Sequence, residues 1–131
     1  MFLDASAAIA VLAREEDEVL ISQKLFSSAC LLFSPLAYYE TCVGLARALS
    51  MDPDKAETLV RKLLESLQVR TVDLTAEIGF AAVAAHTRFG KGRHRASLNM
   101  GDCFAYACAK VHKVPLLCKG NDFIHTDIEL A

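Results

Sequence analysis

Short apolar runs alternate with longer stretches of helical periodicity along the chain. Three runs are apolar throughout and are interpreted as buried strands, at residues 2–3, 30–33 and 116–118. A fourth strand is predicted at residues 69–73, where apolar and polar side chains alternate, and the tail from Asp127 is a candidate for a short edge strand. Strands that alternate with helices in this way predict a parallel sheet with helices on both faces.

Capping signals mark where several helices begin. Ser34-Pro35 and Asp52-Pro53 each place an N-cap residue before a proline at the first helical position, and Thr75 is a third N-cap. The predicted helices cover residues 6–14, 15–27, 35–49, 53–67, 76–89 and 102–112, with a loop at 91–99. Because the last helix is almost wholly apolar, we expect it to be buried.

The composition limits the fold and the class of protein. A chain of 131 residues with 53% hydrophobic and 23% charged residues fits one compact domain, being too short for two and too apolar for disorder. The net charge of −2 gives no overall signature of polyanion binding, so any such attraction must come from a local basic patch. No apolar run approaches membrane-spanning length and no targeting signal is evident, which predicts a cytoplasmic protein without a membrane partner.

The five cysteines form no Cys-x-x-Cys pair, and the four histidines have no zinc-finger spacing. We therefore expect the cysteines to be small buried apolar residues in a reducing compartment rather than disulfides or zinc ligands.

Acidic residues stand at the ends of predicted elements. Asp4 directly follows the first strand, Asp122 lies four residues beyond the run at 116–118, and Asp102 begins the apolar helix. Taken singly, Asp4 and Asp102 are explained by helix capping alone. The other interpretation is a shared site, because α/β sheets bind ligands at the carboxyl ends of their strands.

Glu40 is a weaker candidate by its own periodicity. The apolar stripe of its helix consists of Tyr38, Cys42, Leu45 and Leu49, and Glu40 points roughly away from it. The pattern favours a solvated glutamate or a surface pair with Arg47.

Several carboxylates in one pocket would repel one another unless a cation neutralised them. Oxygen ligands without a histidine or a thiolate suit Mg²⁺ or Mn²⁺ rather than zinc. Such an ion lowers the pKa of bound water and holds a phosphate oxygen, as phosphodiester hydrolysis requires. The acidic residues therefore indicate phosphodiester chemistry, provided that the fold brings them together.

Basic side chains crowd into eight positions just before Asn99: Arg88, Lys91, Arg93, His94 and Arg95. Cations beside an anionic metal site suit the capture of a polyanionic substrate. A solvated surface loop is the alternative, and the position upstream of Asp102 favours the functional interpretation. Gly90, Gly92 and Gly101 suggest that this loop is mobile.

Four segments carry a family resemblance. They are Phe2-Leu3-Asp4-Ala5-Ser6, Tyr39-Glu40-Thr41, residues 89–106, and residues 116–123 with the following Thr126-Asp127. Together they resemble the PIN-domain ribonucleases, and specifically the VapC toxins of bacterial toxin–antitoxin pairs. The resemblance extends from end to end of the chain, and the last two segments are the specific ones.

The resemblance implies a single PIN domain over residues 1–131, an α/β/α sandwich whose parallel sheet of four to five strands has the order 3-2-1-4-5. It also implies an endoribonuclease that depends on Mg²⁺, with Mn²⁺ as a possible substitute, and that leaves a 5′-phosphate and a 3′-hydroxyl.

For the site, the resemblance implies that Asp4 and Asp102 are the metal ligands and that Glu40 and Asp122 complete the catalytic set. Ser6 and Asn99 would orient these carboxylates. Asp127 competes with Asp122 for the fourth place, because Asn121 stands where relatives often have an acidic residue. The RNA-binding residues would be Lys91, Arg93, His94 and Arg95.

The implied partners are a cognate VapB-type antitoxin, whose tail would cover the acidic cleft, an RNA substrate and a second copy of the chain. DNA would be contacted only through the antitoxin. Two alternatives remain open: a PIN domain without activity that serves as a binding partner, and a receiver-type signalling domain with Asp73 as phosphoacceptor and Lys119 as its partner.

Overall fold

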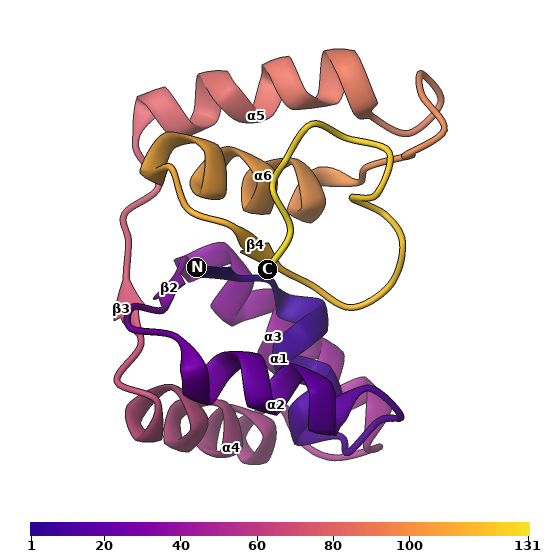
Figure 1. Cartoon of the computed structure of the whole chain (residues 1–131). Coiled ribbons are helices and arrows are strands. Elements are labelled where there is room, and N and C mark those ends of the chain that lie inside the picture. The colour runs from indigo at the N-terminus through magenta and orange to yellow at the C-terminus, as the bar shows by residue number, and fades with distance from the viewer.

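The computed structural model describes all residues from Met1 to Ala131. Its centre is a parallel sheet of four strands with only two residues each, in the order β3-β2-β1-β4 (Figure 1). The strands are β1 (Phe2–Leu3), β2 (Leu32–Phe33), β3 (Arg70–Thr71) and β4 (Leu116–Leu117). The predicted order is confirmed for these strands. The fifth is reduced to a single parallel bridge between Leu130 and Leu116.

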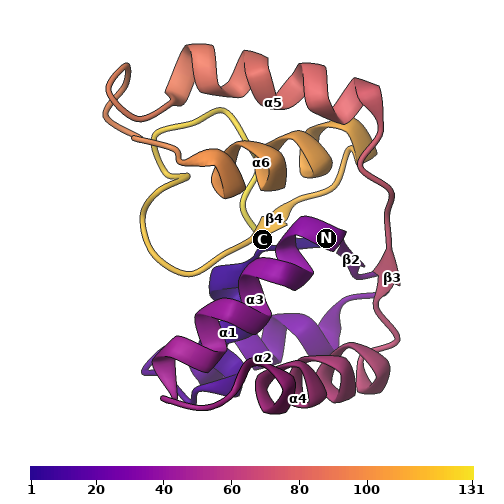
Figure 2. The same ribbon diagram turned by 180° about the vertical axis from the view of Figure 1, so that it is seen from behind.

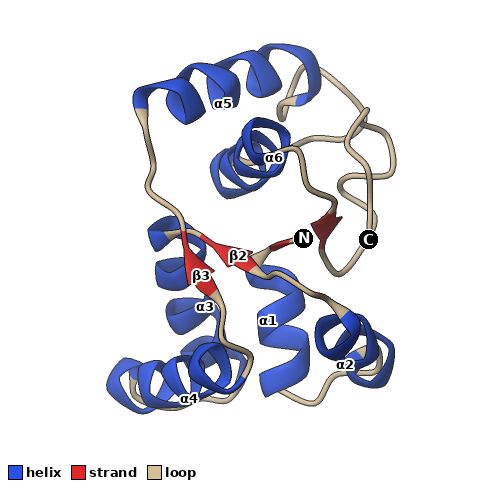
Figure 3. Ribbon diagram, turned by 60° about the vertical axis from the view of Figure 1, so that its left-hand side comes forward, coloured by secondary structure: helices blue, strands red, loops and turns tan.

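Six helices enclose the sheet from both sides. In Figures 1 and 2, α5 and α6 lie on one side and α1 to α4 on the other, and Figure 3 shows the strands between the two layers. The helices are α1 (Ala5–Leu12), α2 (Glu18–Ser27), α3 (Pro35–Ala48), α4 (Pro53–Ser66), α5 (Ala76–Phe89) and α6 (Met100–His112). The predicted α/β/α sandwich is therefore confirmed.

The caps form largely as the sequence indicates. The side chain of Ser34 accepts a hydrogen bond from the Ala37 N–H, and that of Thr75 accepts one from the Ile78 N–H. Asp52 precedes α4 without a side-chain cap bond. Helix α6 begins at Met100, two residues before the predicted start, because Asn99 and not Asp102 is the N-cap.

The core lies between the sheet and the helices that cover it. Both residues of β1 and β4 are buried, and α6 is buried along most of its length between the sheet and α5. Small residues dominate the buried side of α6, so the two helices of that layer can approach closely. None of the helices combines the length and the apolar character that crossing a membrane requires.

Candidate active site

Asp4 lies where β1 ends and α1 begins. Its side chain is buried, with 6% exposed, and its Oδ2 accepts hydrogen bonds from the N–H of Ser6, at 2.9 Å, and from the Ser6 hydroxyl. The Ser6 Oγ in turn accepts a hydrogen bond of 2.9 Å from the N–H of Lys119, just beyond β4. Ser6 therefore fixes the Asp4 carboxylate against the carboxyl ends of two neighbouring strands.

Asp102 is the third residue of α6 and forms a reciprocal capping box with Asn99. The Asp102 N–H donates to the side-chain oxygen of Asn99 at 3.0 Å, and the Asn99 N–H donates to Oδ2 of Asp102 at 2.8 Å. The Asp102 side chain therefore belongs both to the helix cap and to the acidic site. The Asn99 backbone N–H fixes the Asp102 carboxylate, and the Asn99 side chain caps the first turn of α6.

Glu40 reaches this site from α3. A Cβ placed on Gly101 would overlap the Glu40 carboxylate, so the glutamate packs directly against the first turn of α6. The expectation of a solvated Glu40 or a pair with Arg47 was wrong, since the side chain is half-buried and no ion pair with Arg47 forms. Gly101 belongs to this helix and not to the basic loop before it, and sequence reasoning missed its role as the small residue beside Glu40.

Burial and mutual repulsion link the carboxylates electrostatically. Burial raises the pKa of Asp102 to about 6 and that of Glu40 to about 7, and repulsion from Asp4 adds to both rises. Burial also raises the pKa of Asp4. Asp122 is exposed, and its charge contributes to the raised pKa of Asp4 and of Asp102. Four acidic residues from distant parts of the sequence therefore share one electrostatic environment.

Asp127 lies in a different environment. It accepts hydrogen bonds from Tyr106 and Arg88, and these donors lower its pKa. Its charge is not among the causes of the raised pKa of Asp4, Glu40 or Asp102. Of the two candidates for the fourth position, only Asp122 acts electrostatically on Asp4 and Asp102.

The donor set fits a hard divalent cation. All of its groups are carboxylates, and a bound cation would offset the burial and the repulsion that raise the pKa of three of them. No three Asp, Glu, His or Cys side chains stand close enough together to form a ready-made metal centre, so holding one ion requires the acidic side chains to draw inward.

The basic loop lies beside the start of α6. Its ends are joined by hydrogen bonds from the Lys91 N–H to the Leu98 carbonyl and from the Leu98 N–H to the Phe89 carbonyl. Lys91, Arg93 and Arg95 are exposed and form no ion pair.

His94 lies differently from the three exposed cations of the loop. It packs edge-on against Phe89, with ring centroids 5.3 Å apart, and its Nδ1 accepts a hydrogen bond from the Ala96 N–H. It therefore contributes to the shape of the loop.

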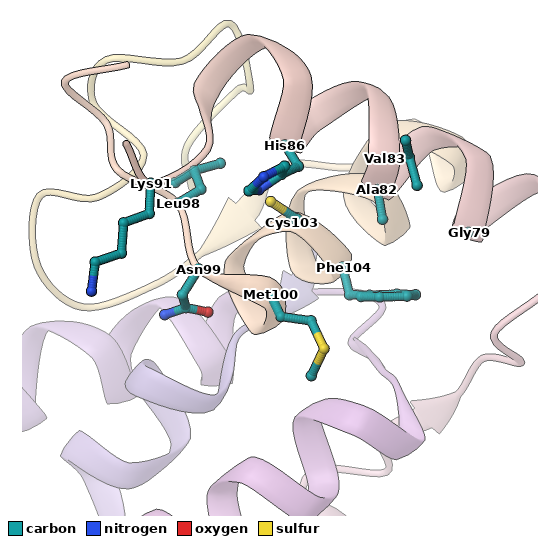
Figure 4. A pocket seen from close by; sticks show the side chains of 10 residues that line it. All are labelled: Gly79, Ala82, Val83, His86, Lys91, Leu98, Asn99, Met100, Cys103 and Phe104. Carbon is teal, nitrogen blue, oxygen red and sulfur yellow. The ribbon is translucent and has the colours of Figure 1, made fainter. Parts of the chain in front are cut away.

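An apolar groove runs between α5 and α6 close to the loop. Figure 4 shows Val83 and Phe104 along it, with Lys91 and Asn99 at the end nearest the acidic site. Met100, on its rim, is 66% exposed.

Comparisons with known proteins agree with this architecture. The family model for the PIN domain matches residues 1–129. Ribonuclease VapC30 of Mycobacterium tuberculosis is 41% identical over 131 residues, which cover 98% of this chain and 95% of that protein. Ribonuclease VapC of Mycolicibacterium smegmatis is 38% identical over 128 residues, covering 98% and 97%. The chain therefore belongs to the PIN-domain family and, within it, to the VapC group.

Solved structures have the same fold at low sequence identity. VapC20 of Mycobacterium tuberculosis, a toxin that cleaves the sarcin-ricin loop, has a TM-score of 0.79 at 17% identity, covering 99% of this chain and 97% of its own. VapBC2 from Rickettsia felis, bound to a promoter DNA fragment, has a TM-score of 0.75 at 13% identity, covering 99% and 96%. A toxin–antitoxin complex from Klebsiella pneumoniae has a TM-score of 0.72 at 17% identity, covering 99% and 95%.

The receiver alternative was wrong. Receiver-type sheets have the strand order 2-1-3-4-5, whereas this sheet has the order 3-2-1-4. Lys119 pairs with Glu15 and Asp17 rather than with Asp73.

Proposed function

We propose that this protein is a Mg²⁺-dependent endoribonuclease toxin, with Mn²⁺ as a possible substitute for Mg²⁺. The observation that supports the proposal most directly is the raised pKa of Asp4, Glu40 and Asp102, which burial causes and to which repulsion among these carboxylates and Asp122 adds. The names of its relatives as ribonucleases support the choice of RNA as substrate.

Asp4 and Asp102 would hold the cation. In each residue Oδ2 already accepts hydrogen bonds, which leaves Oδ1 for a metal ion. When bound, Mg²⁺ supplies an activated water and a hold on a phosphate oxygen. Ser6 and Asn99 keep the two carboxylates in place, and Asp122 adds a fourth negative charge at the exposed side.

Glu40 would accept the proton of the attacking water. Its carboxylate packs against the first turn of α6 at Gly101, next to Asp102, which would place it within reach of a water at the metal site. This route does not need the 2′-hydroxyl as nucleophile, so a 5′-phosphate and a 3′-hydroxyl would result, and substrate choice would depend on the shape of single-stranded loops.

The exposed cations of the basic loop would bind the RNA backbone. Lys91, Arg93 and Arg95 have no acidic partner within the chain, so their charge is available for phosphate groups. His94 would contribute mainly by holding the loop against Phe89.

We also propose that the protein acts in the cytoplasm and is neutralised there by a cognate VapB-type antitoxin, through which alone it would meet DNA. Two of its structural neighbours are toxin–antitoxin complexes, and one of them was solved with promoter DNA, which supports this partner.

A homodimer through the groove between α5 and α6 is the remaining part of the proposal. Phe80, Val83 and Met100 are exposed apolar side chains next to this groove, and interface cores are poor in charged residues. The pocket beside α2, by contrast, includes Asp17, Lys24 and Lys119. Val83→Glu should therefore convert a dimer to a monomer in light scattering, whereas Val19→Glu on α2, with the same 68% exposure, should leave the dimer intact. A dimer that survives Val83→Glu would refute this surface.

The decisive test of activity compares carboxylates inside and outside the cluster. Asp4→Asn and Asp102→Asn should abolish Mg²⁺-dependent cleavage of RNA while the protein stays folded. Asp73→Asn, at an exposed aspartate at the edge of the sheet, should cleave like the unmodified protein. Full activity of either cluster variant, or cleavage that persists in EDTA, would refute the function. Complete inactivity of the unmodified protein with Mg²⁺ would instead favour a binding module.

A further inference from the structure

Asp127 accepts hydrogen bonds from residues of α5 and α6, although it lies outside the cluster of Asp4, Glu40, Asp102 and Asp122. Its Oδ1 accepts a hydrogen bond of 2.5 Å from the hydroxyl of Tyr106, a residue of α6 with only 4% exposed. Its Oδ2 accepts a hydrogen bond of 3.2 Å from Arg88 on α5 and lies 3.6 Å from Nζ of Lys110. Lys110 also donates to the Asp127 carbonyl at 3.2 Å.

The contacts of Asp127 with Tyr106, Arg88 and Lys110 form an anchor, the Asp127 anchor, which fixes the end of the segment that carries Asp122. The segment begins at Lys119, whose N–H donates to Ser6 and whose ammonium pairs with Glu15, and it ends at Asp127. Between Lys119 and Asp127 only Phe123 is fully buried. Asp122 itself accepts no hydrogen bond, so its position depends on how the segment is held at both ends.

The same anchor contacts the base of the basic loop. Arg88 lies over the ring of Phe89, 4.6 Å from its centroid, and Phe89 packs on Tyr106 at 5.7 Å and on His94 at 5.3 Å. A row of aromatic and charged side chains thus connects Asp127 with the loop that carries the exposed cations.

We propose that Asp127 is a positioning residue that keeps Asp122 facing Asp4 and Asp102, and not a metal ligand itself. The inference rests on the proposed metal site. Groups that orient ligands in this way commonly change metal affinity by about tenfold or more when they are removed.

The chain contains a matched control. Glu57 on α4 accepts hydrogen bonds from the hydroxyl of Tyr38 at 2.8 Å and from Arg61 at 2.6 Å. As at Asp127, a tyrosine and an arginine both donate to one carboxylate. Here, however, the three residues belong to α3 and α4, and none lies in the segment at 119–127. Loss of either anchor should lower stability, and only loss of the Asp127 anchor should change the metal site.

The experiment measures binding of Mn²⁺ alone by electron paramagnetic resonance, with thermal unfolding in parallel. Asp127→Ala should weaken Mn²⁺ binding about tenfold and raise the Mg²⁺ concentration needed for cleavage, with activity recovering at high Mg²⁺. Tyr106→Phe, which keeps the Arg88 contact, should have a smaller effect in the same direction. Glu57→Ala and Tyr38→Phe should bind Mn²⁺ within about twofold of the unmodified protein.

Three results would overturn the proposal. Unchanged Mn²⁺ affinity in both Asp127→Ala and Tyr106→Phe would show that the anchor does not act on the site. Equal losses in Asp127→Ala and Glu57→Ala would show a general effect of stability. Complete loss of Mn²⁺ binding in Asp127→Ala, with Tyr106→Phe unchanged, would make Asp127 a ligand. Failure of the proposed function has a different signature: either the unmodified protein would not cleave RNA with Mg²⁺, or Asp4→Asn would still cleave it, whatever the behaviour of Asp127.

Discussion

Replacing Glu40 by glutamine should stabilise the metal-free protein above neutral pH. Burial, together with repulsion from Asp4 and Asp102, raises the pKa of Glu40 from its ordinary value of 4.5 to about 7. The folded protein therefore binds the proton of Glu40 more tightly than the unfolded chain does. Stability is lost as the pH rises between about 4.5 and about 7, and the loss is complete above that range.

The magnitude follows from the same two values. Each pH unit between them corresponds to about 1.4 kcal/mol, which gives an upper bound of about 3 kcal/mol for the loss at pH 8. Because Glu40 is only half-buried, water screens part of this effect, and we expect about 1–2 kcal/mol. Glu40→Gln removes the charge and keeps the shape, so the variant should recover this free energy and unfold roughly 3–6 °C higher.

Thermal unfolding followed by circular dichroism in EDTA, from pH 4.5 to pH 8.5, measures the difference. The two proteins should unfold together at pH 4.5 and separate as the pH rises through 7. Mg²⁺ should then stabilise the unmodified protein more than Glu40→Gln, because the ion loses one of its negative neighbours in the variant. Parallel pH profiles, or a variant that is less stable at pH 8, would refute the argument that Glu40 belongs to the acidic cluster.

Other substitutions test individual contacts of the site. Ser6→Ala removes the hydroxyl that joins the first strand to the segment after β4 and should cost about 1 kcal/mol in urea unfolding. Gly101→Ala should displace the Glu40 carboxylate and lower the rate of RNA cleavage by about tenfold or more, although alanine is the better helix former; an unchanged rate would show that Glu40 has room to move. Arg93→Ala and Arg95→Ala should each raise KM for RNA and reduce the slope of log affinity against log salt by about 0.7, with kcat nearly unchanged; unchanged slopes would mean that the loop does not touch phosphate.

Local signals in the sequence predicted most of the helices and the positions of the strands, whereas the order of the strands came from the family resemblance. Ser34-Pro35 and Thr75 each act through bonds within a few residues, so the start of their helices can be read without knowledge of the fold. The end of α5 at Phe89 was likewise marked by Gly90. The fifth strand was not predictable in length, since it depends on how the tail meets β4 and amounts to one bridge at Leu130.

The site could be predicted only in part, because its geometry is made by contacts between distant segments. Glu40 lies away from the main apolar stripe of α3, and only the passage of α6 along that side brings it to Gly101 and Asp102. The choice between Asp122 and Asp127 likewise depends on Tyr106, which is fifteen or more positions from both and draws Asp127 into a separate network. The family motifs, and not the periodicity of α3, suggested the proposed role of Glu40.

Asp4 and Asp102 are each engaged in a hydrogen bond before any metal ion binds. Asp4 and Asp102 each use one oxygen to start a helix, so each has a single oxygen left to give. Ca²⁺ collects six to eight oxygen atoms and readily takes both from one carboxylate, whereas Mg²⁺ keeps several of its waters and needs only one or two carboxylate contacts. The first turns of α1 and α6 thus determine which oxygen of each aspartate stays free of hydrogen bonds, and one free oxygen on each of two aspartates matches the few carboxylate contacts that Mg²⁺ needs.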